Sequence, residues 1–232
     1  MVTDTYTKMF KALSPKNITE FAKAGKGTVK DGIKVYVLAW FVTLILGIIG
    51  FFLAVGTAGA DMQALSGMIG LEIVGFLGVV VLILASIIGL IWGIVMNYIT
   101  QYAGAFTATS VFKGKGKFEQ QFYLAMLFTG AIMIIGSVFG IVDALVPAVG
   151  IVSGFIMLAL GIWTIYLLYH TIREVHNIEL VGALISTIVV FVVGIAFLVV
   201  LGIVLAMLGI AALGAGALGG AAATGGLENL GM

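Results

Sequence analysis

The side chains best suited to chemistry lie close together late in the chain. Both histidines of the sequence, His170 and His176, flank Arg173 and Glu174. His170 and Glu174 are four residues apart and would share one face of a helix. A metal ion there would need a third ligand, for which Glu119 is the candidate, and an enclosed cavity. A solvated loop whose charges lie at an interface explains the same residues more simply, so we predict no metal site and no cofactor.

A short run of alternating lysine and glycine is the clearest candidate for binding. Its glycines would free the backbone and its lysines supply charge, so its amides and ammonium groups would grip an anion. Phe118 would anchor the following turn, and Glu119 would form an ion pair with Arg173. The alternative is a mobile loop that only helps to set topology. The predicted site for a partner or an anion comprises Lys113, Gly114, Lys115, Gly116, Lys117, Phe118, Glu119, Arg173, Glu174 and His176.

Patterns typical of enzymes are missing from the sequence. The chain has no cysteine, which excludes thiol catalysis and thiolate metal sites. It also has no Ser-His-Asp spacing and no phosphate-binding loop. The run Gly214-Ala-Gly216-Ala-Leu-Gly219 matches the dinucleotide fingerprint on paper, but it lies in a Gly/Ala-rich tail and not between a strand and a helix. We therefore predict no enzymatic activity, no catalytic residue and no nucleic-acid partner.

The composition of the chain indicates what kind of structure must position these residues. The chain has 232 residues, of which 62% are hydrophobic and 9% are charged. A soluble domain carries about 25% charged residues, so this chain cannot cover its own surface with polar groups. Lipid must be the solvent for much of it. The high hydrophobicity and low charge exclude a disordered chain, and the absence of cysteine excludes a secreted disulfide scaffold.

Five stretches are long and apolar enough to cross a bilayer, which takes about 20 residues. They are Ile33–Gly56, Ile73 to about Met96, Phe122–Val142, Pro147–Tyr169, and Leu180 to about Leu208. The predicted fold is an all-α bundle of five transmembrane helices preceded by amphipathic surface helices. Its segments are residues 1–32, the transmembrane domain 33–208, and a Gly/Ala-rich tail 209–232.

The positive charges of the chain predict its topology. Seven lysines lie between Lys8 and Lys34, three lie between Lys113 and Lys117, and the last positive residue is Arg173. Five spans place all three segments on one side of the bilayer. Acidic residues without any Lys or Arg fall on the other side: Asp61, Glu72, Asp143 and Glu228. Because positive loops stay inside, we predict a multi-pass protein of the cell membrane with its N-terminus in the cytoplasm and its C-terminus outside.

Two short amphipathic helices are expected before the first span. Met9, Phe10 and Leu13 can share one face, and Ser14-Pro15 is typical of a helix start. Thr28-Val-Lys-Asp31 resembles a capping box that opens the first span. A basic segment beside a span binds anionic headgroups, at about 1 kcal/mol per lysine near the surface. The alternative is that these lysines only set topology.

Two features of the spans have open interpretations. Residues 97–112 are polar but uncharged, and we favour a cytoplasmic extension or interfacial helix over a tilted span. The spans also carry glycines four residues apart, which let helix backbones approach closely. These pairs are Gly89/Gly93, Gly136/Gly140 and Gly150/Gly154. We expect them to pack within one bundle, with oligomer formation through the same strips as the alternative.

The order of features resembles a known family. Its most specific pieces are Gly114-Lys-Gly116-Lys117-Phe118 after the second span and Ile172-Arg173-Glu174-Val175-His176 after the fourth, preceded by Ser14-Pro15-Lys16. Together they resemble the Yip domain of Ypt/Rab-interacting membrane proteins, in its prokaryotic form, over about residues 10–206. The resemblance implies five spans with a cytoplasmic N-terminus. In eukaryotes such proteins serve membrane traffic and contact small GTPases, a role that nothing in this sequence carries over.

Two functions remain open at this point. The favoured one is a non-enzymatic membrane scaffold whose cytoplasmic face binds a protein partner or anionic lipid, or shapes the bilayer. The alternative is a channel or carrier for a small solute, with a cavity lined by Asn97, Thr100 and Gln101. A continuous polar cavity past these residues would favour transport, and a packed interior would favour the scaffold.

Overall fold

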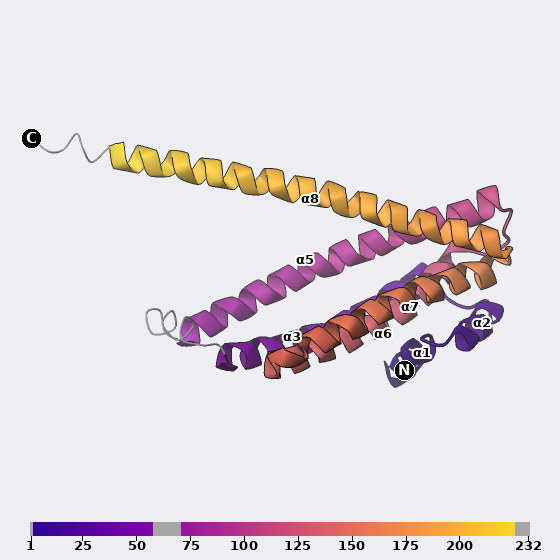
Figure 1. The fold of residues 1–232 in the computed structure, drawn as a ribbon. Helices are drawn as coiled ribbons and strands as arrows, with labels where there is room; N and C mark the ends of the chain where they lie inside the picture. The colour runs from indigo at the N-terminus through magenta and orange to yellow at the C-terminus, as the bar shows by residue number, and fades with distance from the viewer. Residues whose placement is uncertain (1, 58–70, 226–232) are drawn as a thin grey trace, which may run out of the picture. The chain divides into compact units, whose positions relative to one another are not determined.

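A computed structural model describes residues 2–57 and 71–225, and every regular element in these ranges is helical (Figure 1). Contacts divide the chain into two compact units, Met1–Val190 and Phe191–Met232. The residues predicted to bind all lie in the first unit. Its α-helices, with α8 continuing into the second unit, are α1 (Val2–Lys11), α2 (Pro15–Lys23), α3 (Val29–Thr57), α5 (Leu71–Phe106), α6 (Phe118–Leu145), α7 (Gly150–His176) and α8 (Leu180–Gly225).

The prediction of five membrane-spanning helices is confirmed by length and composition. The five apolar segments are Val29–Ala54, Phe76–Val111, Phe118–Leu145, Gly150–His176 and Leu180–Ile203. The second one is longer than predicted, because α5 continues without a break through Asn97 and ends in a π-helical turn, Thr107–Val111. Its 36 residues alone make a rod of about 54 Å. Residues 97–112 are therefore a direct continuation of the second span.

The polar side chains of this continuation mostly bond to their own helix. Asn97 Nδ2 donates to the Gly93 carbonyl at 2.8 Å, and Thr100 Oγ1 donates to the Met96 carbonyl at 2.8 Å. Tyr98 and Tyr102 are exposed, and both rings pack edge-on against Phe118, with centroids 5.0 and 5.5 Å apart. Polar residues in a helix are tolerated in this way because each hydroxyl or amide finds a carbonyl one turn back.

The two predicted N-terminal helices are present as α1 and α2, but the predicted face of α1 is wrong. Met9 is fully buried, whereas Phe10 is 46% exposed. Adjacent residues point about 100° apart on a helix, so only one of them can face a neighbour. Met9 reaches α6, where its Cε would lie 2.7 Å from a Cβ placed on Gly130. The helix α1 is therefore docked on α6.

The first span begins with the predicted capping arrangement. The Asp31 amide donates to Thr28 Oγ1 at 3.1 Å, and the Thr28 hydroxyl donates to Asp31 Oδ2 at 2.7 Å. From this start α3 runs along α6, its most extensive packing partner. Trp40 Nε1 ties α3 to α5 by donating to the Ser86 carbonyl at 2.9 Å.

The expectation that paired glycines pack the bundle holds only in part, because in two of the three pairs one glycine meets a neighbouring helix and in the third pair neither does. Gly93 lies against the Tyr36 hydroxyl, and a Cβ on Gly136 would be 3.2 Å from Met157 Cε. The others have no neighbour within 4 Å among the described residues: Gly89, Gly140, Gly150 and Gly154. These helices touch through large side chains instead, so glycine spacing alone does not mark a contact in a chain this rich in glycine.

Candidate functional site

The lysine loop, residues 113–117, has a defined backbone and connects the π-helical turn to α6. The Gly114 amide donates to the Ala108 carbonyl at 2.9 Å, and the Lys115 amide donates to the His176 carbonyl at 3.0 Å. Lys113 adopts a left-handed φ of 58°. The loop is thus fastened both to the end of α5 and to the end of α7, which joins the two segments that the sequence placed in one site.

The loop glycines are required by space, and this corrects the prediction that they free the backbone. A Cβ on Gly114 would lie 2.9 Å from both the Ala108 carbonyl oxygen and His176 Cβ. A Cβ on Gly116 would collide with the Val175 carbonyl group. Any side chain at Gly116 would therefore push the loop off the end of α7. The glycines face inward so that two backbones can meet.

The loop lysines face the opposite way. Lys113, Lys115 and Lys117 are all exposed, and so is Glu119. These exposed residues alternate along the chain with partly buried Gly114, Gly116 and Phe118. The loop therefore carries a row of exposed ammonium groups on a backbone that is hydrogen-bonded to Ala108 and His176.

Beneath the loop lies a chain of buried polar side chains, the glutamine–histidine network of Gln101, Gln121 and His176. His176 Nε2 donates to Gln121 Oε1 at 2.7 Å. Gln121 Nε2 donates to Gln101 Oε1 at 2.9 Å and to the Gln101 carbonyl at 3.1 Å. All three residues are buried, and they link α7, α6 and α5. Burial in a low-dielectric interior strengthens these hydrogen bonds and makes the loss of any partner expensive.

His176 is therefore part of the framework, and the prediction that it contacts a partner directly is not supported by its position. It is fully buried, and its Nδ1 has no hydrogen-bond partner among the described residues. Arg173 is exposed and Glu174 is partly exposed. Of the predicted turn, only these two side chains reach the surface beside the lysine loop.

The predicted ion pair between Glu119 and Arg173 is absent. Within the described residues the ion pairs are Lys8–Asp4 and Lys34–Asp31, each between neighbours on one helix. His170 is engaged elsewhere, with its Nε2 2.9 Å from the hydroxyl of Thr19 on α2. In the same part of the chain, no group of three His, Asp or Glu side chains comes close enough to hold a metal ion.

The sequence did not reveal how α2 is attached to this end of the bundle. Gln120 Nε2 donates to the Ala22 carbonyl at 2.5 Å, and Trp163 Nε1 donates to the Leu13 carbonyl at 3.0 Å. With the Thr19–His170 bond, these contacts clamp α2 against α6 and α7. Gln120 and Gln121 are adjacent amides at the start of an otherwise apolar span. This pair was the sequence signal for the contact of Gln120 with α2 and for the contacts of Gln121 in the glutamine–histidine network.

The residues predicted to line a transport cavity are used in packing. Thr100 and Gln101 are buried, with Gln101 held in the glutamine–histidine network. Asn97 bonds to its own helix. Their polar groups are occupied by the protein, which removes the observation that favoured a channel or carrier.

Comparison with known proteins identifies the family of the chain. The sequence model of the Yip1 domain matches residues 29–201, from the start of α3 to well within α8. No curated protein and no solved structure gave a significant match. The matched range includes the lysine loop, the glutamine–histidine network, the first four apolar segments and most of the fifth. Members of the family are generally non-enzymatic, transport-related membrane proteins. The chain thus belongs to the Yip1 domain family and is a multi-pass membrane protein.

Proposed function

We propose that this Yip1-domain protein is a non-enzymatic membrane scaffold whose basic face binds a partner protein or anionic lipid headgroups, or shapes the bilayer. The observation that carries the proposal is the lysine loop, which displays Lys113, Lys115 and Lys117 outward on a backbone fastened to His176 and Ala108. The exposed guanidinium of Arg173 extends the same basic face.

A fixed row of charges binds better than a mobile one. Ordering flexible side chains and loops on binding opposes association, so a loop that is already ordered loses less entropy. Each lysine near an anionic membrane surface contributes about 1 kcal/mol, and the three act together. The backbone bonds of the lysine loop therefore favour binding over a purely topogenic role.

The orientation belongs to the same proposal. We place the N-terminus, the lysine loop and Arg173 in the cytoplasm and the C-terminus outside, because this puts every Lys and Arg on one side of five spans. We also retain the prediction that the chain is a prokaryotic form resident in the cell membrane. Reporters fused at Met1 and after Met232 should appear on opposite sides of the membrane. Reporters found on the same side would contradict this orientation.

The binding proposal is tested by reversing the charge of the loop. The triple variant Lys113→Glu, Lys115→Glu, Lys117→Glu should lose capture by vesicles containing phosphatidylglycerol and lose any protein partner recovered by affinity purification. The matched control reverses three exposed lysines of the N-terminal helices: Lys11, Lys16 and Lys23. It makes the same change in net charge while leaving the loop intact.

The two variants separate a loop-specific site from bulk attraction. We expect the loop variant to lose at least about tenfold more binding than the control, since three contributions of about 1 kcal/mol act at one place. Equal losses would show that only net charge matters. Unchanged binding by the loop variant would overturn the proposal.

A further inference from the structure

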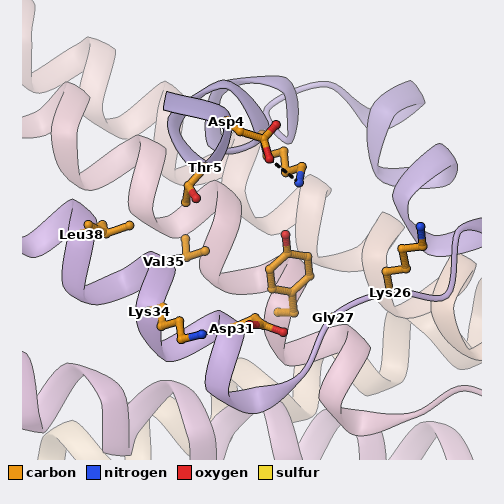
Figure 2. A pocket seen from close by; sticks show the side chains of 10 residues that line it. Asp4, Thr5, Lys26, Gly27, Asp31, Lys34, Val35 and Leu38 are labelled. Atoms are coloured by element: carbon orange, nitrogen blue, oxygen red, sulfur yellow. Dashed lines mark hydrogen bonds and ion pairs between the residues drawn. The ribbon is translucent and has the colours of Figure 1, made fainter. Parts of the chain in front are cut away.

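A charged pocket of about 380 Å³ lies between α1, the start of α3 and α6, separate from the lysine loop (Figure 2). Its volume falls in the range of ligand sites, about 300–1,000 Å³. Asp4, Thr5 and Lys8 line it from α1. Lys26 and Gly27 come from the linker before α3. The remaining lining residues are Asp31, Lys34, Val35 and Leu38 of α3 and Tyr123 of α6.

The pocket carries charges of both signs. Asp4 lies 2.8 Å from Lys8, and Asp31 lies 3.6 Å from Lys34. Figure 2 shows Asp4 and Asp31 on different helices with the space between them, and Lys26 at the side. In the described part of the chain Lys26 makes no ion pair. The walls thus offer two carboxylates and three ammonium groups, one of which is unpaired.

A hydroxyl group without a partner completes the lining. The ring of Tyr123 occupies the space where a Cβ on Gly27 would stand, and Gly27 has a φ of 129° that favours glycine. This contact fixes the ring beside the linker. The Tyr123 hydroxyl makes no hydrogen bond to any described residue, although it lines the pocket. It is available to donate to a ligand.

We propose that this pocket binds the zwitterionic headgroup of a phospholipid that bears a phosphate and a primary ammonium, as in phosphatidylethanolamine. Lys26 and the Tyr123 hydroxyl face the phosphate, and Asp4 and Asp31 face the ammonium. This site deepens the lipid-binding part of the proposed function and rests on it, but it uses other residues and another class of lipid.

The charges of the pocket select this ligand class. A purely anionic headgroup would pair with Lys26 but leave the two carboxylates without a ligand group to bind, and a purely cationic group would meet three ammonium groups. A quaternary ammonium such as choline cannot donate hydrogen bonds and is recognised by cages of several aromatic rings. Tyr123 is the single aromatic residue lining this pocket. A primary ammonium instead forms strong charge-assisted hydrogen bonds to carboxylates.

The location of the pocket suits a lipid. It lies at the first turns of α3, whose apolar segment begins at Val29. The end of a span is where headgroups lie, because the apolar part of the helix occupies the hydrocarbon core. Val35 and Leu38 extend the lining along α3 toward that core. They supply apolar surface where the glycerol and the first methylenes of a bound lipid would lie.

The experiment measures lipid retention by native mass spectrometry of the full chain in detergent. Dioleoyl phosphatidylethanolamine, phosphatidylcholine and phosphatidylglycerol are added at equal concentration. We expect retention of phosphatidylethanolamine to exceed that of phosphatidylcholine by about tenfold, the effect of one or two charge-assisted hydrogen bonds. Equal retention of these two lipids would overturn the proposal.

Variants assign the retention to the pocket. Asp4→Asn and Tyr123→Phe each preserve shape and remove one polar group, and each should reduce phosphatidylethanolamine retention by about three- to tenfold. Asp31→Asn also alters the start of α3, so Asp4→Asn provides the test that leaves the cap intact. The control Lys16→Ala removes an exposed charge outside the pocket and should change nothing. Retention unaffected by both pocket variants would place the lipid elsewhere and overturn the proposal.

Two further arms separate the sources of the ligand and the two proposals. Soluble O-phosphoethanolamine should stabilise the protein much less than the lipid does, and equal stabilisation would show that the pocket takes a free zwitterion and not a lipid.

The lysine-loop triple variant should lose phosphatidylglycerol and keep phosphatidylethanolamine. If it keeps phosphatidylglycerol, the loop proposal fails while the pocket stands. If it loses both lipids, the pocket has no separate specificity.

Discussion

The two halves of α6 differ sharply in how they are surrounded. From Phe118 to Ala131 the helix carries nine buried residues, including Gln121. From Ile132 to Leu145 not one of its residues is buried. The first half of α6 therefore lies in a close-packed junction beside the lysine loop. The second half leaves much of its surface uncovered by the described residues.

Polar contacts follow the same division. The packed half joins the glutamine–histidine network and the clamp on α2, both made of hydrogen bonds between different helices. In the open half the side-chain hydrogen bond between helices, among the described residues, runs from Ser153 Oγ to Asp143 Oδ1 at 2.6 Å. In lipid, helix association gains little from the hydrophobic effect and depends on packing and hydrogen bonds. The junction therefore holds the bundle together, and the open half is the part free to meet lipid or another protein.

The largest expected effect comes from adding one methyl group in each region. Gly116→Ala places a Cβ against the Val175 carbonyl group, and backbone atoms cannot move aside as a flexible side chain can. We therefore expect the free energy of unfolding to fall by about 1–3 kcal/mol or more. Gly140→Ala, on the open half, meets no atom within 4 Å among the described residues and should be neutral or slightly stabilising. Thermal unfolding in detergent measures both. Equal destabilisation would erase the distinction between the two regions.

The next effect tests the network itself. Gln121→Leu keeps the volume but leaves Gln101 and His176 buried with unpaired groups, so we expect a loss of about 1–3 kcal/mol. The double variant with Gln101→Leu should lose less than the sum of the single variants, because both changes act on one network. Additive losses would mean that the three side chains are not coupled. Ser137→Ala, whose hydroxyl bonds only to its own helix, serves as the control.

A smaller effect is expected from the polar contact of the open half. Ser153→Ala removes the bond to Asp143, and we expect a loss of about 0.5–1.5 kcal/mol by the same unfolding measurement. A loss as large as that of Gln121→Leu would show that the open half is held as firmly as the junction.

The smallest effect concerns an exposed ion pair. Lys8 lowers the pKa of Asp4 through a hydrogen bond and its charge, and Asp4 raises the pKa of Lys8. A lowered carboxyl pKa adds stability above its unfolded value, and this is lost as the pH falls through the folded value. Because the Asp4 side chain is exposed, Asp4→Asn should leave the melting temperature unchanged at neutral pH. A clear change would mean that surface charge, and not buried bonding, fixes α1.

The sequence predicted the parts of this fold that depend on local chemistry. Five apolar runs give five helices, and Thr28 and Asp31 give the cap that opens the first span. It predicted that the lysine loop and the Arg173–His176 turn lie close together, and the Lys115 amide does bond to the His176 carbonyl, although not through the predicted ion pair. The sequence could not predict which side chains point inward, because burial of His176 and exposure of Glu119 depend on which helices meet.

Partners that are far apart in the chain were the main omission. Gln121 meets Gln101 and His176 only after three helices have assembled. Composition cannot tell a glutamine that bonds across helices from one that faces water. The glycines of the lysine loop were misinterpreted for a similar reason, since flexibility and close approach favour the same residue and only the position of Val175 separates them.

The π-helical turn Thr107–Val111 makes chain length, as well as residue type, a constraint on this region. A π-turn holds one more residue than an α-turn, and here the Phe112 amide bonds back to the Thr107 carbonyl. Deleting one residue would restore an α-turn and rotate everything after it by about 100°. The loop glycines would then no longer face the Ala108 and Val175 carbonyl groups. Substitutions should therefore be tolerated in this turn far better than deletions. Related proteins should keep its length more strictly than its residue types.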